Sequence, residues 1–366
     1  MATANSITTQ RLFALLRLGI LGGDYPRPIF ERMSGTKWQD IYNLALEQGV
    51  LAFTYDGVRK LDEQHQPELE IKIQWAYNVS HIEKLHKKQL ASAQRIVDTF
   101  SQHGIETMIL KGLSLAALYS EPSHRQSGDI DIYLMGDYER GNKVASSIGC
   151  NVKYDYFVHS EFGVDGVNVE NHHYFINPNI NHTARYIQKV LSDLVCNHSP
   201  HPIVSGALMP SAEFATLFLT RHSSWHYARE AIRLRDICDW GVFLNHYRDS
   251  IDSATVMQHL VNSGLERYAS VITTLAEQVL GISSPLPFAD KQSDLSARVL
   301  EDILTFENEQ KHRKIGFLRT FMHKIRNRFS RKWCYDLVVP DSYWGNIWYS
   351  IKTYITHPLA VFRAKL

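Results

Sequence analysis

Two aspartates stand two positions apart in a short apolar run, and their type and spacing suit the binding of divalent cations. Asp129 and Asp131 alternate with Ile130 and Ile132, the pattern of a strand with one polar and one buried face. Both carboxylates then lie on the same side, about 6.6 Å apart along the strand. That spacing suits a pair of hard cations such as Mg²⁺, which prefer oxygen ligands. A solvated strand end gives the same pattern, so the surrounding residues decide between the two readings.

A second polar group lies upstream, where a short apolar run is followed by a glycine. Gly112 allows the backbone to approach an anion closely, with Lys111 as a cation and Ser114 as a hydroxyl beside it. Arg125 and Ser127, just before the aspartates, add another cation and another hydroxyl. These residues favour a phosphate-binding turn, although Gly112 could equally serve only to ease a tight turn.

The elements that must position these residues are short and mixed. Alternating and apolar runs within 106–176 predict a small mixed sheet with two or three helices. Asp165-Gly166, between two such runs, predicts a β-hairpin. Strands are expected at 107–110, 129–134, 151–158, 161–164 and 167–175, and helices at 113–119 and 138–148.

Helical periodicity lies on both sides of this sheet. Residues 7–104 and the chain after Pro210 repeat apolar residues at helical spacing, and 194–210, rich in Pro, His and Ser, is expected to be a loop and a boundary. Helices are expected at 82–100, 211–226, 228–244, 257–280 and 296–310. The predicted fold class is therefore α+β, with an N-terminal helical region (1–104), an α/β core (105–205) and a C-terminal helical domain (206–366).

Composition sets further bounds. The chain of 366 residues is 44% hydrophobic and 21% charged, which excludes global disorder. Its net charge of +1 gives no general sign of a nucleic-acid partner. The four cysteines are widely spaced without a CxxC pair, which excludes a disulfide framework and a cysteine zinc site. Without a signal-peptide pattern or a membrane-length apolar run, the protein is expected to be cytoplasmic, with no membrane span.

The polar groups together resemble a known signature. It is carried by Ile109-Leu110-Lys111-Gly112, Leu115-Ala116, Tyr119, Pro122, Arg125 and Gly128-Asp129-Ile130-Asp131-Ile132. This motif resembles that of the polymerase-β-like nucleotidyltransferase superfamily and, more narrowly, a bacterial family of uncharacterised nucleotidyltransferases. It is also similar to nucleotidyltransferase toxins, although those carry a second glycine where this chain has Leu113.

The resemblance implies an enzyme that uses Mg²⁺, as two ions, and binds ATP or another nucleoside triphosphate. It implies transfer of the nucleoside monophosphate to an acceptor hydroxyl or phosphate. It also implies a third carboxylate on a neighbouring strand, for which Glu170, followed closely by His172, is the candidate, with Asp155 and Glu161 as rivals. The expected catalytic and metal-binding residues are Asp129, Asp131 and Glu170, and the expected nucleotide-binding residues are Lys111, Gly112, Ser114, Arg125, Ser127, Arg235 and Asp236.

Two helical segments carry further polar residues. Arg235, Asp236 and Asp239 resemble an RD-x-x-D element that faces the active site in the related enzymes, while a surface ion pair is the alternative. His222 either closes over the nucleotide or is a hydrogen-bonded core histidine. His222 and His226 are four residues apart, but without an HExxH pattern or a third ligand they do not predict a zinc site.

The acceptor stays open at this point. A small molecule or a surface-polymer precursor suits the near-neutral charge. A tRNA or protein acceptor suits the toxin resemblance and the basic segment 311–332, which could also meet a membrane surface or simply be solvated. A non-catalytic nucleotide-binding module is the alternative from another class.

Overall fold

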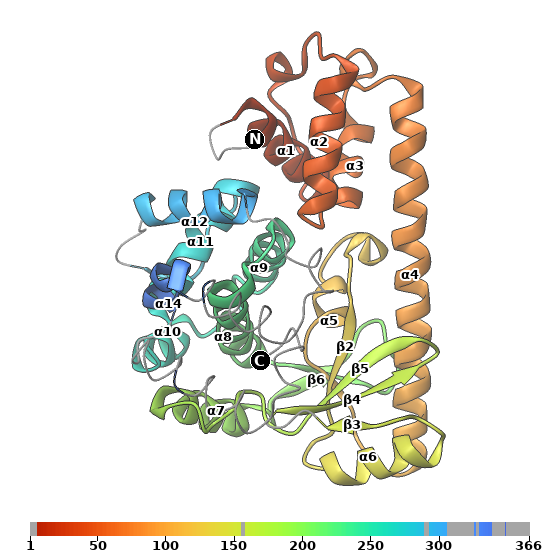
Figure 1. The fold of residues 1–366 in the computed structure, drawn as a ribbon, viewed down its shortest axis with the longest axis vertical. Coiled ribbons are helices and arrows are strands. Elements are labelled where there is room, and N and C mark those ends of the chain that lie inside the picture. Colours follow the sequence, from red (N-terminus) through yellow and green to blue (C-terminus); the bar gives the residue numbers. More distant parts are fainter. Residues whose placement is uncertain are drawn as a thin grey trace.

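The computed structural model describes residues 6–154, 158–288, 293–305 and 329–338, with the single positions 326 and 348. Figure 1 shows one long helix along the side of the molecule, running from a group of N-terminal helices to a sheet, with further helices opposite. This confirms the α+β class. Most of the basic segment 311–332 and the rival carboxylate Asp155 lie outside the described residues.

The sheet has seven strands in the order β3-β4-β5-β2-β1-β7-β6. The β2–β5 and β1–β7 pairs are parallel and the other pairs are antiparallel. The strands are β1 (Met108–Ile109), β2 (Asp129–Tyr133), β3 (Lys153–Tyr154), β4 (His159–Val164), β5 (Val167–His172), β6 (His198–Pro200) and β7 (Leu208–Pro210).

The hairpin expected at Asp165-Gly166 is confirmed. β4 and β5 pair antiparallel around these two residues, whose φ angles are +52° and +73°. Two consecutive positive φ angles are those of a type I′ turn, which matches the twist of the flanking strands. This turn fixes the register between β4 and β5, and so decides which of their side chains share a face.

The expectation that 194–210 is only a loop is wrong. β6 and β7 lie within it and extend the sheet beyond β1. Each strand has three residues and includes a proline, so neither shows an alternating pattern in the sequence. Main-chain pairing rather than side-chain pattern places these strands.

One face of the sheet is apolar, as the alternation in the sequence predicts. Ile130 and Ile132 of β2 and Val169 of β5 are buried in one cluster with Ile96 and Phe100 of α4 (Leu69–Gln102). α4 is much longer than the helix expected at 82–100 and reaches up to the N-terminal helices (Figure 1). With this face covered, Asp129, Asp131 and Glu170 are directed to the other face.

The remaining helices precede the sheet in the chain, connect its strands or follow it. They are α1 (Ile7–Ile20), α2 (Gly35–Glu47), α3 (Leu51–Lys60), α5 (Leu113–Ala116), α6 (Tyr138–Ser147), α7 (His182–Leu194), α8 (Ala212–Glu230), α9 (Leu234–His246), α10 (Ser253–Asn262), α11 (Glu266–Leu280), α12 (Ser293–Thr305) and α14 (Lys332–Val338), with 3₁₀ turns at Arg27–Phe30, Glu63–His65 and Pro122–His124. Within these ranges no helix is both long and apolar enough to cross a membrane.

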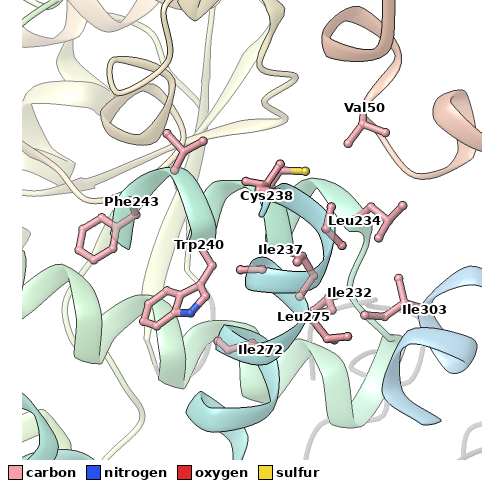
Figure 2. Close-up of a cluster of buried hydrophobic side chains, with 14 of the residues drawn as sticks. Val50, Ile232, Leu234, Ile237, Cys238, Trp240, Phe243, Ile272, Leu275 and Ile303 are labelled. Atoms are coloured by element: carbon pink, nitrogen blue, oxygen red, sulfur yellow. The ribbon is translucent and has the colours of Figure 1, made fainter. Parts of the chain in front are cut away.

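The core of the C-terminal helices forms around α9. Leu234, Ile237 and Trp240 lie among side chains of α11 such as Ile272 and Leu275 (Figure 2). The same view places Val50, from the N-terminal helices, and Ile303 of α12 near the start of α9. The beginning of α9 is therefore a junction between the N-terminal and the C-terminal helices.

The single helix expected at 228–244 is wrong at its start. The chain leaves α8 at Ala231, where φ is +59°, and α9 begins at Leu234. The backbone N–H of Arg233 donates to the Asp236 carboxylate at 2.9 Å, and this bond starts a new helix. The N-cap is an arginine instead of Ser, Thr, Asp or Asn, which hides this start in the sequence.

Helices α1 and α3 cross at two glycines. A Cβ on Gly57 would lie 2.1 Å from the carbonyl oxygen of Leu15, and one on Gly19 would lie 2.1 Å from that of Phe53. Both obstacles are backbone atoms, which cannot rotate away. The close approach of these helices therefore requires glycine at both positions.

We expect Gly57→Ala to lower the free energy of unfolding by roughly 1–3 kcal/mol, because the overpacking exceeds the helix propensity gained. Urea unfolding measures this. Gly35→Ala in α2 is the matched control, since its Cβ would meet only the Ile71 side chain at 3.6 Å, and little change is expected. Equal effects of the two substitutions would contradict the crossing described here.

Candidate active site

Three carboxylates meet on the polar face of the sheet. In the parallel β2–β5 pair, Asp131 lies directly opposite Glu170, and Asp129 lies two residues earlier on β2. One oxygen from each of the three lies within 4.8 Å of the others. The structure therefore brings Glu170 to the aspartate pair, while its rival Glu161 lies one strand further out, opposite Glu170 on β4.

Asp131 is the most enclosed of the three. Its side chain has no exposed surface, and its Oδ1 lies 3.2 Å from both Lys111 Nζ and His172 Nε2. Burial raises the pKa of this carboxyl and Asp129 adds to that, but Lys111 and His172 outweigh both, so the pKa lies below its usual value. Its other oxygen, Oδ2, is buried and has no hydrogen-bond partner in the part of the chain that the structure describes, an arrangement that a bound cation would satisfy.

Lys111 follows β1 and bridges the sheet to α8. Its Nζ donates to His222 Nε2 at 2.9 Å while also contacting Asp131. Burial, together with the charge of Lys111, holds the pKa of His222 well below its usual value, so the imidazole is neutral and accepts this hydrogen bond. His222 therefore positions Lys111, which neutralises the buried Asp131 carboxylate. Of the two roles expected for His222, the structure shows the hydrogen-bonded histidine, with Lys111 as its partner.

Gly112 gives the turn after β1 its shape. Its φ of +64° and ψ of −98° are inaccessible to residues with a side chain, and a Cβ there would lie 3.4 Å from the carbonyl oxygen of Asp129. Ser114 is buried, and its hydroxyl donates to the carbonyl of Ile109 at 2.7 Å and lies 3.1 Å from His201 Nε2. The structure thus uses the Ser114 hydroxyl to anchor the turn.

Arg125 ties the segment before β2 to α9. Its Nε and Nη2 donate to the two oxygens of Asp239 at 3.1 and 2.7 Å, and Tyr119 donates to the same carboxylate at 2.9 Å. Its Nη1 also donates to the Ser127 hydroxyl. Burial lowers the pKa of Arg125, but the paired Asp239 raises it more, so the charge is retained. Asp239 is buried, so the expectation of a surface ion pair does not hold for this residue.

Arg235 and Asp236 lie beside this pair, at the start of α9. Arg235 Nη1 donates to the carbonyl of Gln126 at 3.2 Å, while Asp236 caps its own helix. Burial raises the pKa of Asp236, but Arg235 and the Arg233 N–H outweigh it and keep the carboxylate ionised. Arg235 thus contacts the segment that leads into β2, while Asp236 holds the start of α9.

His159 is a polar residue of this face that the sequence reading missed. It lies opposite His172 across the β4–β5 pair, and its Nε2 is 3.4 Å from Glu161 Oε1 and 3.8 Å from Glu170 Oε2. The signal was the alternation of His159-x-Glu161 on the first arm of the hairpin, which matches Glu170-x-His172 on the second.

Comparison with known proteins places most of the chain in a family. Residues 34–281, more than half of the chain, match the family described as "Uncharacterised nucleotidyltransferase". The matched range includes the three carboxylates, Lys111 and the Arg125–Asp239 pair. No curated protein and no solved structure matches the chain.

We expect Asp239→Asn to lower the free energy of unfolding by roughly 3–5 kcal/mol, because it leaves the buried charge of Arg125 uncompensated. Urea unfolding provides the measurement. Asp193→Asn is the matched control, since it removes one carboxylate from the exposed Lys189–Asp193 pair and is expected to have little effect. Similar losses of unfolding free energy in both variants would show that the buried Arg125–Asp239 pair stabilises the fold no more than an exposed pair does.

His201 gives a pH dependence. Burial lowers its pKa to about 4, against 6.5 in the unfolded chain. Between these values the unfolded state binds a proton that the folded state does not, so stability falls as the pH drops, by about 1.4 kcal/mol per pH unit. We expect His201→Gln to flatten the slope of unfolding free energy from pH 6.5 to 4 by that amount, and Gln substitution of the exposed His173 to leave it unchanged. An unaltered slope in His201→Gln would contradict this assignment.

Proposed function

Because the chain belongs to the family of uncharacterised nucleotidyltransferases, we propose that it transfers a nucleoside monophosphate from a nucleoside triphosphate to an acceptor, releasing pyrophosphate. The observation that carries this proposal is the convergence of Asp129, Asp131 and Glu170 on one face of the sheet. We also assign the fold around them to the polymerase-β-like superfamily, on the motif that includes Lys111-Gly112 and the aspartate pair.

The three carboxylates fit Mg²⁺. They offer only oxygen ligands, and the described residues give the buried Asp131 Oδ2 no hydrogen-bond partner. We propose that this set holds two Mg²⁺ ions. When bound, Mg²⁺ neutralises the phosphate charge and orients the phosphoryl group for in-line displacement.

The residues of the chain have separate tasks in this proposal. Lys111 Nζ, held beside the carboxylates by His222, contacts a phosphate oxygen of the nucleotide, and the Gly112 turn lets the backbone come close to it. Glu170 accepts the proton of the attacking hydroxyl. Arg235, whose buried Nε has no hydrogen-bond partner among the described residues, binds the nucleotide from α9, next to Asp236.

Three further residues act by positioning the site. Ser114 is hydrogen-bonded to Ile109 and His201, which holds the Gly112 turn in place. Arg125 is hydrogen-bonded to Ser127 and Asp239, which holds the start of β2 in place. Positioning of this kind is a major source of rate enhancement in phosphoryl transfer.

For the acceptor we propose a small molecule or a surface-polymer precursor, in keeping with a net charge of +1. Incubation of the protein with each labelled triphosphate and a cell extract tests this. Label in a product that passes a dialysis membrane, or in a lipid-linked glycan, supports the proposal. Label removed by ribonuclease or protease assigns a tRNA or protein acceptor instead. No label, together with nucleotide binding in calorimetry, identifies a non-catalytic nucleotide-binding module.

We expect Asp129→Asn, Asp131→Asn and Glu170→Gln each to abolish this labelling, because each removes a negative charge from the proposed cation site. Glu161→Gln is the matched control, since it changes a carboxylate on the same face one strand away, and it should retain transfer. Circular dichroism melting checks that each variant is folded. Full activity of the double variant Asp129→Asn/Asp131→Asn would exclude the proposed site.

A further inference from the structure

A second group of metal-binding atoms lies beside the carboxylates. His159 and His172 are opposite each other across β4 and β5, and Glu170 is two residues before His172. One ligand atom from each of the three lies within 4.8 Å of the others, and all three side chains are buried. This group offers two imidazole nitrogens and shares only Glu170 with the set of three carboxylates.

The ring of His172 is oriented as in metal-binding histidines. Its Nδ1 lies 3.2 Å from the carbonyl oxygen of Tyr174, which can only accept, so Nδ1 keeps its proton when Nε2 binds a metal ion. Nε2 faces the carboxylate of Asp131 at 3.2 Å. A backbone carbonyl that fixes one ring nitrogen and leaves the other to the ion is the usual outer support of a histidine ligand. A metal ion satisfies an imidazole lone pair and a carboxylate oxygen together.

The spacing is close to that of a coordination sphere. His159 Nε2 lies 3.8 Å from Glu170 Oε2. Neighbouring ligand atoms in a tetrahedral zinc site with bonds of ~2.1 Å are about 3.4 Å apart. A shift of a few tenths of an ångström therefore brings His159 and Glu170 to the spacing of two ligands on one ion, with Glu161 Oε1, 3.4 Å from the same nitrogen, as a further oxygen.

We propose that His159, Glu170 and His172 bind a divalent transition-metal ion of the Zn²⁺ class, at a site distinct from the oxygen-only site of Asp129, Asp131 and Glu170. Imidazole nitrogen suits Zn²⁺ and its neighbours, whereas Mg²⁺ requires oxygen ligands. The proposal does not depend on nucleotidyl transfer. Since Glu170 belongs to both groups, the two ions would lie next to each other.

The test is metal binding by the full chain, stripped of metal by a chelator and kept free of nucleotide. Calorimetric titration with Zn²⁺ is expected to show one tight site per chain, and Co²⁺ to give the visible absorption of a site with nitrogen ligands. His159→Ala should weaken Zn²⁺ binding by at least roughly 10-fold. His173→Ala, which changes the exposed neighbour of His172, is the matched control and should bind as the wild type does.

Asp129→Asn separates the two sites, because it removes a ligand only from the oxygen-only site and should leave Zn²⁺ affinity unchanged. If Asp129→Asn loses Zn²⁺ while His159→Ala retains it, the ion binds to the carboxylates and the proposal is wrong. Absence of stoichiometric Zn²⁺ binding, or of nitrogen ligation in the Co²⁺ spectrum of the wild type, also overturns it. If His159→Ala does not fold, His159→Gln replaces it, because glutamine fills a similar volume.

Discussion

The parallel pairing of β2 with β5 is the constraint on which the site depends. It sets Asp131 opposite Glu170 on a buried face, two residues from Asp129. Carboxylates so close together repel one another, and burial strengthens the repulsion. Lys111 and His172 both approach Asp131 Oδ1 and offset that cost. The sheet therefore concentrates negative charge, and its surroundings supply the positive charge that makes this tolerable.

The surrounding helices act on the two faces in different ways. α4 covers the apolar face, so Asp129, Asp131 and Glu170 are directed to the other face. On that other face, α8 brings His222 to Lys111, and the ring of Phe218 packs edge-on against His172. The Arg125–Asp239 pair fixes α9 to the segment before β2. Segments far apart in sequence thus hold the strands of the site in place. The buried Arg125–Asp239 pair fixes the position of α9 against them.

Local sequence pattern predicted the centre of the site better than its edges. Alternation around Asp129 and Asp131 and the Asp165-Gly166 turn gave the strands and the hairpin, since both are local features. The pairing of Asp131 with Glu170 depends on the register between strands that are distant in sequence. Only the resemblance to the nucleotidyltransferase motif therefore indicated Glu170. Pairing through the main chain hid β6 and β7 within 194–210. Tertiary packing brings Asp239 to Arg125 and His222 to Lys111. Nothing in the local sequence around Asp239 or His222 indicates these partners.

The central claim is that the three carboxylates hold the cations that bind a triphosphate. A crystal structure of the protein with Mn²⁺ and a non-hydrolysable nucleoside triphosphate tests this most directly, because anomalous scattering locates the Mn²⁺. The account predicts Mn²⁺ between phosphate oxygens and the carboxylates of Asp129, Asp131 and Glu170, with Lys111 Nζ moved from Asp131 to a phosphate. Nucleotide bound away from β2, or Mn²⁺ without contact to Asp129 and Asp131, would contradict it.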